Sequence, residues 1–147
     1  MLNLSVLVRF ENQTIVIGKT YQGGIVFYID GTGEHGLVAS PADQGTYLAW
    51  SDASNLVSNL VLNGYDDWLL PSQAGLGLMY KNIGYGAAAP LTNIGGFAPA
   101  YYWGTLAVGY SDWAWEGYFG DHGSGGGAGG NATPIANFLY VRAVRAF

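Results

Sequence analysis

The sequence predicts a single α+β domain, with strands toward both ends, two helices between them and long glycine-rich loops. A chain of 147 residues is the size of one domain with one core. Segments in which apolar residues recur at every second position, as in strands, and segments in which they recur at helical spacing occur in different parts of the chain. Six Phe, five Trp, eleven Tyr and 24 Gly stand beside only 10% charged residues. That composition differs from those of disordered chains and of helical bundles rich in Glu, Lys and Leu, so we expect an aromatic core.

The first third of the chain predicts strands. Apolar and polar residues alternate from Leu2 to Phe10, so residues 1–17 are predicted as an N-terminal strand extension, with a further short strand at 14–17. Gly24–Asp30 is apolar enough for a strand buried on both faces. An Asp-Gly turn follows it, and 37–39 returns from that turn, which predicts a β-hairpin.

The middle third predicts two helices. In the first, Ser51 or Asp52 is the expected N-cap and Gly64 lies just past the expected end. The second is expected from about Ser72, directly after a proline, to Ile83. Their apolar faces have spacings of three and four residues, namely Ala53, Leu56, Val57, Leu60 and Val61 in the first and Leu76, Met79, Tyr80 and Ile83 in the second.

The last third predicts short strands joined by long loops, with a flexible glycine-rich segment at 123–130. In the strand at 112–119, odd positions are expected to face the core and even positions to face water. Residues 138–147 are expected to close the chain as one apolar strand. Arg142 or Arg145 within it is predicted to be buried and paired with a carboxylate.

Charge and composition exclude several classes of function. A net charge of −5 disfavours nucleic acid, anionic membranes and sulfated polysaccharides, since all three are bound through basic patches. The absence of cysteine excludes disulfides, zinc-thiolate sites and thiol chemistry. No segment has the length and apolar character of a membrane span or signal peptide, so any export signal is expected outside this chain.

The sequence predicts no catalytic residues, no metal site and no cofactor. The G-x-G-x-x-G pattern at 31–36 precedes a strand rather than a helix, which favours a hairpin turn over a dinucleotide site. His35 and His122 lie in separate predicted loops without metal-ligand spacing. A carboxylate pair such as Asp112 and Glu116 leaves a carbohydrate-active enzyme open as the less favoured alternative.

The richest functional signal is the cluster of aromatic residues among Gly, Ser and Asn between 104 and 137. Loops selected for binding have this composition, because Tyr and Trp give contact area at low entropic cost. We therefore expect a ligand surface on the loops and outward strand faces of this window. The residues predicted to bind there, as aromatic anchors and polar contacts, are Tyr110, Asp112, Trp113, Glu116, Tyr118, Asp121 and His122.

Several blocks along residues 18–147 resemble the C-terminal domain of bacterial collagen-like adhesins, the Lcl C-terminal family. The blocks occur in order: Tyr21–Tyr28, Gly36–Ala39, Asn63–Ser72, Leu78–Tyr80, Gly96–Phe97, Tyr101–Trp103, Ala114–Trp115 and Tyr140–Phe147. The resemblance implies a C-type-lectin-like fold with two helices against a small twisted antiparallel sheet and paired N- and C-terminal strands. It also implies a surface-exposed, non-enzymatic adhesion module, often trimeric, binding a protein or carbohydrate on a cell surface.

The same fold class includes variable proteins of diversity-generating retroelements, in which mutagenesis of Asn codons cannot produce Trp, Gln, Glu, Lys or Met. Only three of the 37 residues at 104–140 are of these types, against 13 in residues 1–103. The leading hypothesis is therefore a diversified ligand-binding domain of a bacterial surface protein or phage virion. The main alternative is a structural module in which residues 1–17 mediate oligomerisation.

Overall fold

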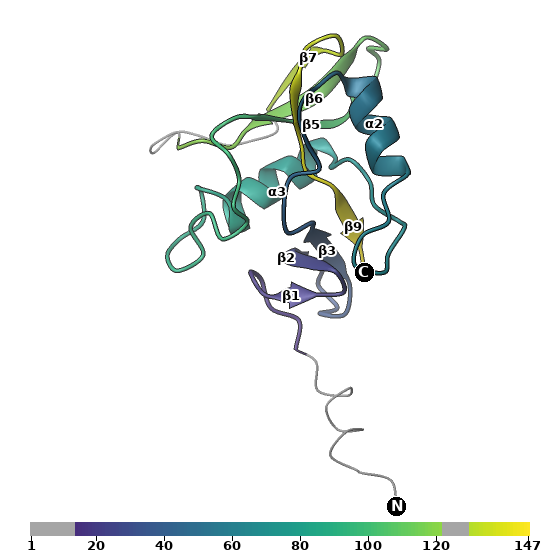
Figure 1. Cartoon of the computed structure of the whole chain (residues 1–147). Coiled ribbons are helices and arrows are strands. Elements are labelled where there is room, and N and C mark those ends of the chain that lie inside the picture. Colours follow the sequence, from purple (N-terminus) through teal and green to yellow (C-terminus); the bar gives the residue numbers. More distant parts are fainter. Residues whose placement is uncertain (1–13, 122–129) are drawn as a thin grey trace, which may run out of the picture.

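The computed structural model describes residues 14–121 and 130–147, and in these ranges it has two helices and two mostly antiparallel sheets. The predicted α+β class is confirmed, although two sheets replace the one expected. Figure 1 shows the sheets toward opposite ends of the molecule, with helix α3 between them. Most of the predicted N-terminal strand extension lies outside the described residues.

The first sheet has the strand order β1-β2-β3-β9, and every neighbouring pair in it is antiparallel. The predicted hairpin is confirmed as β2 and β3. Residues 14–17, expected to form a strand, have no strand structure. The predicted pairing of terminal strands is also not found among the described strands, since β1 and β9 lie at opposite edges. The four strands are β1 (Thr20–Tyr21), β2 (Gly24–Ile29), β3 (Gly36–Ala39) and β9 (Val144–Ala146).

The second sheet has the strand order β4-β8-β5-β6-β7. The pair β5 and β8 is parallel, while the other pairs in this sheet are antiparallel. This arrangement places the starts of β5 and β8 at the same end of the sheet as the ends of β4 and β6. The strands are β4 (Gly45–Leu48), β5 (Tyr101–Leu106), β6 (Trp113–Tyr118), β7 (Asn131–Pro134) and β8 (Leu139–Val141).

The last segment of the chain connects the two sheets. The prediction of one continuous strand at 138–147 is wrong, because β8 ends at Val141 and β9 begins at Val144. Between them the chain changes partners: β8 pairs with β4 and β5, whereas β9 pairs with β3. The Arg142 side chain is buried at this crossing. The sequence shows a mainly apolar run across both strands and so gives no local signal for the change of sheet.

Helix α3 (Gln73–Ile83) matches the prediction closely. The Ser72 hydroxyl accepts a hydrogen bond from the Gly75 amide at 3.0 Å, so it caps the helix as expected. The helix contacts β2 of one sheet and both β5 and β6 of the other. The four predicted face residues, Leu76, Met79, Tyr80 and Ile83, are all buried in this position.

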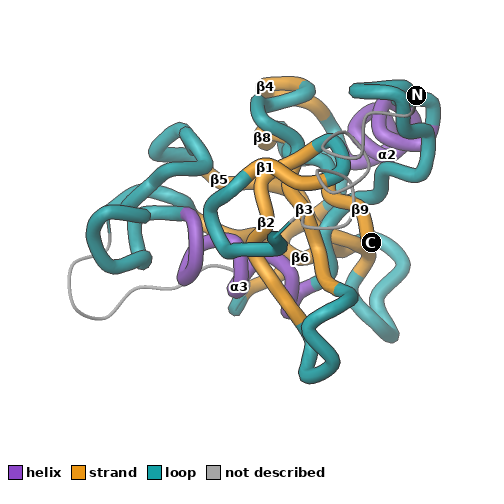
Figure 2. The backbone as a smooth tube through the Cα atoms, turned by 90° about the horizontal axis from the view of Figure 1, so that it is seen from below, coloured by secondary structure: helices purple, strands orange, loops and turns teal. Residues whose placement is uncertain are grey.

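Helix α2 (Trp50–Ser58) is shorter than predicted and begins differently. The N-cap is Ala49, without a side-chain hydrogen bond, and the Trp50 amide donates to the carbonyl of Ile135 at 3.1 Å. A tertiary contact therefore sets the start, so the predicted N-caps Ser51 and Asp52 are wrong. The Asn59 side chain donates to the Asn55 carbonyl at 2.9 Å and ends the helix before the expected Gly64. Figure 2 shows α2 and α3 on different sides of the strands.

Core residues lie on both faces of the second sheet, so the prediction that even positions of 112–119 face water is wrong for Ala114. Ala114 and Gly117 are buried, whereas Trp113 is 43% exposed. One cluster of buried residues contains Ala114 with Trp68 and Val141, and a second contains Phe119 with residues of α3. Trp68, Val141 and Val144 are buried, whereas Trp115, at an odd position predicted to face the core, is only half-buried.

The predicted burial and pairing of an arginine holds for both candidates. Arg145 is 6% exposed, and its Nε lies 2.7 Å from an oxygen of Asp67. Its guanidinium also lies 3.8 Å from the ring centroid of Tyr65 and donates to the Gln22 carbonyl. Arg142 is 1% exposed and pairs with Asp43 at 2.9 Å. These contacts tie the segments that contain Gln22, Asp43 and Asp67 to the last residues of the chain.

Candidate ligand-binding site

The residues predicted to bind ligand do not form one site, because strand β6 separates them. Trp113 is the first residue of β6 and Tyr118 the last, so their Cα atoms lie about 16 Å apart along the strand. Tyr110 and Asp112 are exposed in the loop before Trp113. Asp121 is exposed beyond the other end of the strand, and His122 lies outside the described residues.

At the first end of β6, Tyr110, Trp113 and Ala132 line a hollow of about 310 Å³. Tyr110 is 65% exposed, and the neighbouring Val108 is almost fully exposed. This hollow brings together two of the predicted residues. Its described lining is almost entirely apolar, so it offers few polar groups to orient a ligand.

Glu116 lies in the middle of β6, with Trp103 opposite it on β5 and Asn131 opposite it on β7. Its side chain is half-buried, and this burial raises the pKa of its carboxyl. It is not among the described residues that line the hollow at Tyr110. The structure therefore does not bring Glu116 together with the other predicted residues.

At the second end of β6, aromatic side chains from neighbouring strands surround a hollow of about 300 Å³, which we call the aromatic groove. Five of its eight described lining residues are aromatic. Tyr118 belongs to the predicted set, while the other aromatic residues were not predicted as site residues. The lining consists of Tyr47, Pro99, Ala100, Tyr101, Tyr118, Phe138, Leu139 and Tyr140.

The topology of the second sheet explains why these residues meet. Tyr101 begins β5, and Phe138 and Leu139 lie at the start of β8, which runs parallel to β5. Tyr118 ends the antiparallel β6, and Tyr47 lies near the end of the antiparallel β4. All these positions fall at the same end of four adjacent strands. The order and the directions of these four strands therefore bring the aromatic side chains of the groove together.

The rings of the aromatic groove are arranged in contact pairs. The ring centroids of Tyr101 and Tyr118 are 5.0 Å apart, and those of Tyr47 and Tyr140 are 5.3 Å apart at an angle of 69°. Both pairs have the tilted or edge-to-face geometry that aromatic rings favour. A hydrogen bond with the Tyr47 side chain raises the pKa of the Tyr140 phenol, so this hydroxyl is protonated at neutral pH.

Tyr47 is held in an unusual backbone conformation. Its φ of +54° lies in the left-handed region, where a bulky residue is strained. The residue sits at the irregularity between Gly45 and Leu48 in the pairing of β4 with β8. Its side chain is nevertheless 67% exposed, so burial does not account for the strain. Backbone strain that presents an exposed aromatic ring is typical of a binding surface.

A buried polar network supports the aromatic groove from below. Tyr102 is fully buried next to Tyr140, with ring centroids 5.4 Å apart. Its hydroxyl donates to Asp43 at 3.0 Å and accepts from the Ala98 amide at 2.9 Å. Burial raises the pKa of the Tyr102 phenol, which keeps it protonated and able to donate. Asp43 in turn pairs with Arg142, so three neighbouring chain segments are fixed beneath the exposed rings.

No protein-family model matches this chain, and comparison with curated proteins finds no match.

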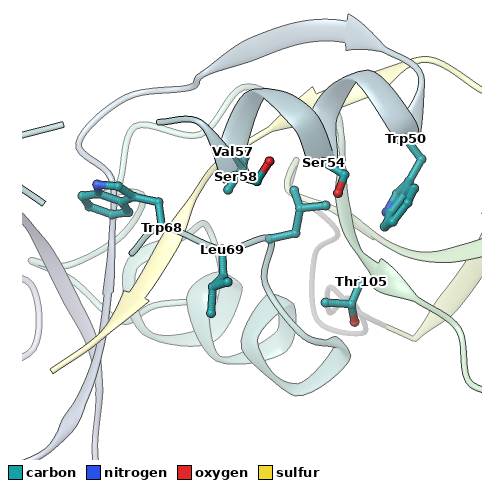
Figure 3. A pocket seen from close by; sticks show the side chains of 8 residues that line it. Trp50, Ser54, Val57, Ser58, Trp68, Leu69 and Thr105 are labelled. Atoms are coloured by element: carbon teal, nitrogen blue, oxygen red, sulfur yellow. The ribbon is translucent and has the colours of Figure 1, made fainter. Parts of the chain in front are cut away.

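A third hollow, of about 240 Å³, lies between α2 and the segment at 68–70 (Figure 3). Trp50 and Ser54 point from the helix toward Thr105, as Figure 3 shows. The Trp50 indole already donates to the Gly104 carbonyl at 2.9 Å. This hollow contains none of the predicted site residues, and both of its tryptophans, Trp50 and Trp68, donate to backbone carbonyls.

The chemistry available at the aromatic groove is recognition of a neutral surface. None of its described lining residues carries a charge at neutral pH, and its polar side-chain groups are phenol hydroxyls. Within the described ranges, no group of three or more His, Asp or Glu side chains is placed to hold a metal ion. Neither helix in these ranges is long and apolar enough to cross a membrane.

Sequence reasoning missed Tyr47, Tyr101, Phe138 and Tyr140 as members of one site. Each is an aromatic residue near the end of a predicted or actual strand, which is a signal that the sequence does contain. Their proximity depends on the parallel pairing of Tyr102 with Tyr140, residues separated by 37 others. No local pattern reports such a pairing, since a parallel ladder forms between distant segments.

Gly120 provides a test of how Tyr118 is positioned. A Cβ at Gly120 would lie 2.5 Å from the Tyr118 hydroxyl and 2.6 Å from its Cζ. We expect Gly120→Ala to displace the Tyr118 ring while the fold persists, because the end of a single side chain can rotate away. Chemical shifts of the Tyr118 and Tyr101 ring protons measure the displacement. Unchanged ring shifts would show that Gly120 does not control the groove.

Proposed function

We propose that this chain is a ligand-binding module that recognises its partner through the aromatic groove. The observation that carries the proposal is the set of exposed aromatic rings held over a buried network. Tyr47 is 67% exposed and Phe138 is 63% exposed, although large apolar rings are costly to leave in water. The Tyr47 ring contacts Tyr140, which packs in turn against the buried Tyr102, and the Tyr102 hydroxyl donates to Asp43. Rigid aromatic anchors of this kind dominate binding energy at interfaces.

We further propose that this module acts in adhesion at a bacterial or phage surface and that part of it is diversified. The resemblance to the Lcl C-terminal family supports a C-type-lectin-like fold and a role in adhesion at a bacterial or phage surface. We include in the proposal a diversified region at 104–140, whose loop at 107–112 exposes Val108 and Tyr110. A reverse-transcriptase gene nearby, with a repeat of the last third of this gene, would support diversification. Flanking DNA without either would contradict it.

Binding to cell surfaces tests the proposed function. The variant Tyr47→Asn/Phe138→Ser removes two exposed rings, and Asn tolerates the left-handed backbone at position 47. We expect folding to persist and retention on a panel of intact bacterial and epithelial cells to fall at least about tenfold. Fluorescently labelled protein measures retention, and the melting temperature reports folding.

Two further variants locate the surface. Tyr85→Ser removes an exposed ring outside the aromatic groove and is the matched control. Tyr110→Ser removes a ring at the opposite end of β6. A loss confined to Tyr110→Ser would place recognition at that end and overturn the assignment to the aromatic groove. Retention that is unchanged in every variant, or absent in the wild-type protein, would contradict recognition through aromatic surfaces and favour a structural module.

A further inference from the structure

The geometry points to an uncharged saccharide chain as the ligand of the aromatic groove. This inference rests on the proposed function and adds the chemical class of the ligand. A pyranose ring has apolar C–H faces and a rim of hydroxyl groups. It therefore needs a site that offers aromatic faces together with neutral hydrogen-bonding groups.

The lining of the aromatic groove has this combination. Four tyrosines supply ring faces and phenol hydroxyls that both donate and accept hydrogen bonds: Tyr47, Tyr101, Tyr118 and Tyr140. Phe138, 63% exposed, adds a ring without a polar group. A ligand with alternating apolar and hydroxyl surface fits such a lining better than a uniformly apolar one, because phenol hydroxyls buried without partners would cost binding energy.

Charge argues against ionic ligands. The described lining contains no basic side chain, and the whole chain has a net charge of −5, so an acidic saccharide would be repelled without a counter-charge. A cationic peptide would need a free carboxylate beside the rings. Asp43 acts electrostatically on Tyr140, but its carboxylate is already held by Arg142 and Tyr102. A neutral ligand needs neither a basic side chain nor a free carboxylate in the lining.

The volume and the rigidity of the aromatic groove favour a short stretch of a saccharide as its ligand. A hollow of about 300 Å³ lies at the lower end of small-ligand sites. Among the rings around it, Tyr140 packs against Tyr102, which is fully buried and hydrogen-bonded at both its donor and acceptor sides. A site fixed before binding loses little conformational entropy on binding. It can therefore hold a few sugar units without an extended interface.

Titration with defined oligosaccharides tests the inference. The probes are hexasaccharides of glucose, mannose, galactose and N-acetylglucosamine, with hyaluronan hexasaccharide as the acidic probe and hexalysine as the cationic one. We expect at least one neutral hexasaccharide to bind, as measured by calorimetry, and the charged probes not to bind. Tyr140→Phe should weaken that binding about fivefold, because it removes a hydroxyl that bonds the Tyr47 side chain and retains hydrogen-bonding capacity for a sugar. Tyr47→Asn should weaken it about tenfold or more through loss of a ring.

The outcomes separate the ligand class from the proposed function. Binding of a neutral hexasaccharide that Tyr47→Asn abolishes and Tyr85→Ser preserves would support both. Failure of every neutral probe, with cell retention still dependent on Tyr47 and Phe138, would overturn the saccharide and leave the binding module intact. Preferential binding of hyaluronan or hexalysine would also overturn it. Saccharide binding that Tyr47→Asn leaves unchanged would refute the groove as its site.

Discussion

Arg142→Met is expected to lower the free energy of unfolding by about 3–5 kcal/mol, because it leaves a largely buried carboxylate without its counter-charge. Arg142 is 1% exposed, and the Asp43 side chain is 21% exposed. The guanidinium also donates to the carbonyls of Gly95 at 2.7 Å and Ser40 at 3.1 Å. Methionine fills a similar volume but satisfies none of these acceptors. Equilibrium denaturation in guanidinium chloride measures the loss.

Two further variants show whether the loss of stability comes from the pairing of Arg142 with Asp43. Lys19→Met removes an exposed cation and is expected to change stability by no more than about 0.5 kcal/mol. In the double variant Arg142→Met/Asp43→Asn, the uncharged amide still accepts the Tyr102 hydroxyl, so part of the lost stability should return. An Arg142→Met loss equal to that of Lys19→Met would show that the buried pair does not hold the sheets together.

The sequence was most informative where one local rule decides the structure. Ser72 lies directly before a helical spacing of apolar residues, and the structure places it as the N-cap of α3. The hairpin of β2 and β3 likewise follows from an apolar run, an Asp-Gly turn and a second apolar run. Such signals lie within a few residues of the structure that they specify, so a single sequence contains them.

Prediction failed where contacts between distant segments override the local pattern. Helix α2 begins at Trp50 because its amide bonds to Ile135, which is 85 positions further along the chain. The alternation of core-facing and water-facing residues expected around β6 fails because core residues pack against both faces of the sheet. The small residues Ala114 and Gly117 are therefore buried, whereas Trp113, at the start of the strand, is exposed. Local hydrophobicity cannot distinguish one covered face from two.

The candidate site was only partly predictable for the same reason. Aromatic abundance directed attention to Tyr118, which lines the aromatic groove. Yet Tyr110 and Trp113, close to Tyr118 in sequence, lie at the other end of β6. Sequence proximity brings residues onto one strand, whereas a site at a sheet end is assembled from several strands. Tyr47 and Tyr140 therefore contribute to the groove from distant parts of the chain.

Trp103→Ala is expected to cost about 3–5 kcal/mol, since it removes the largest kind of side chain from a closed core. Trp103 is fully buried with Trp68 and Val141. Its indole also donates to the Leu48 carbonyl at 2.7 Å, which fixes the end of β4 beside Tyr47. Trp103→Phe keeps much of the packing but leaves that carbonyl unpaired, so we expect an intermediate loss of about 1–3 kcal/mol.

Trp113→Ala is the matched control, because it makes the same substitution on the neighbouring strand at a residue that is 43% exposed. We expect it to cost much less than Trp103→Ala in thermal and chemical denaturation, since much of its side chain is already in water. If the two variants lose equal stability, the hollow at Tyr110 is part of the core and not a surface. If Trp103→Phe folds but loses cell retention, Trp103 positions Tyr47 through Leu48, and the aromatic groove depends on the buried frame beneath it.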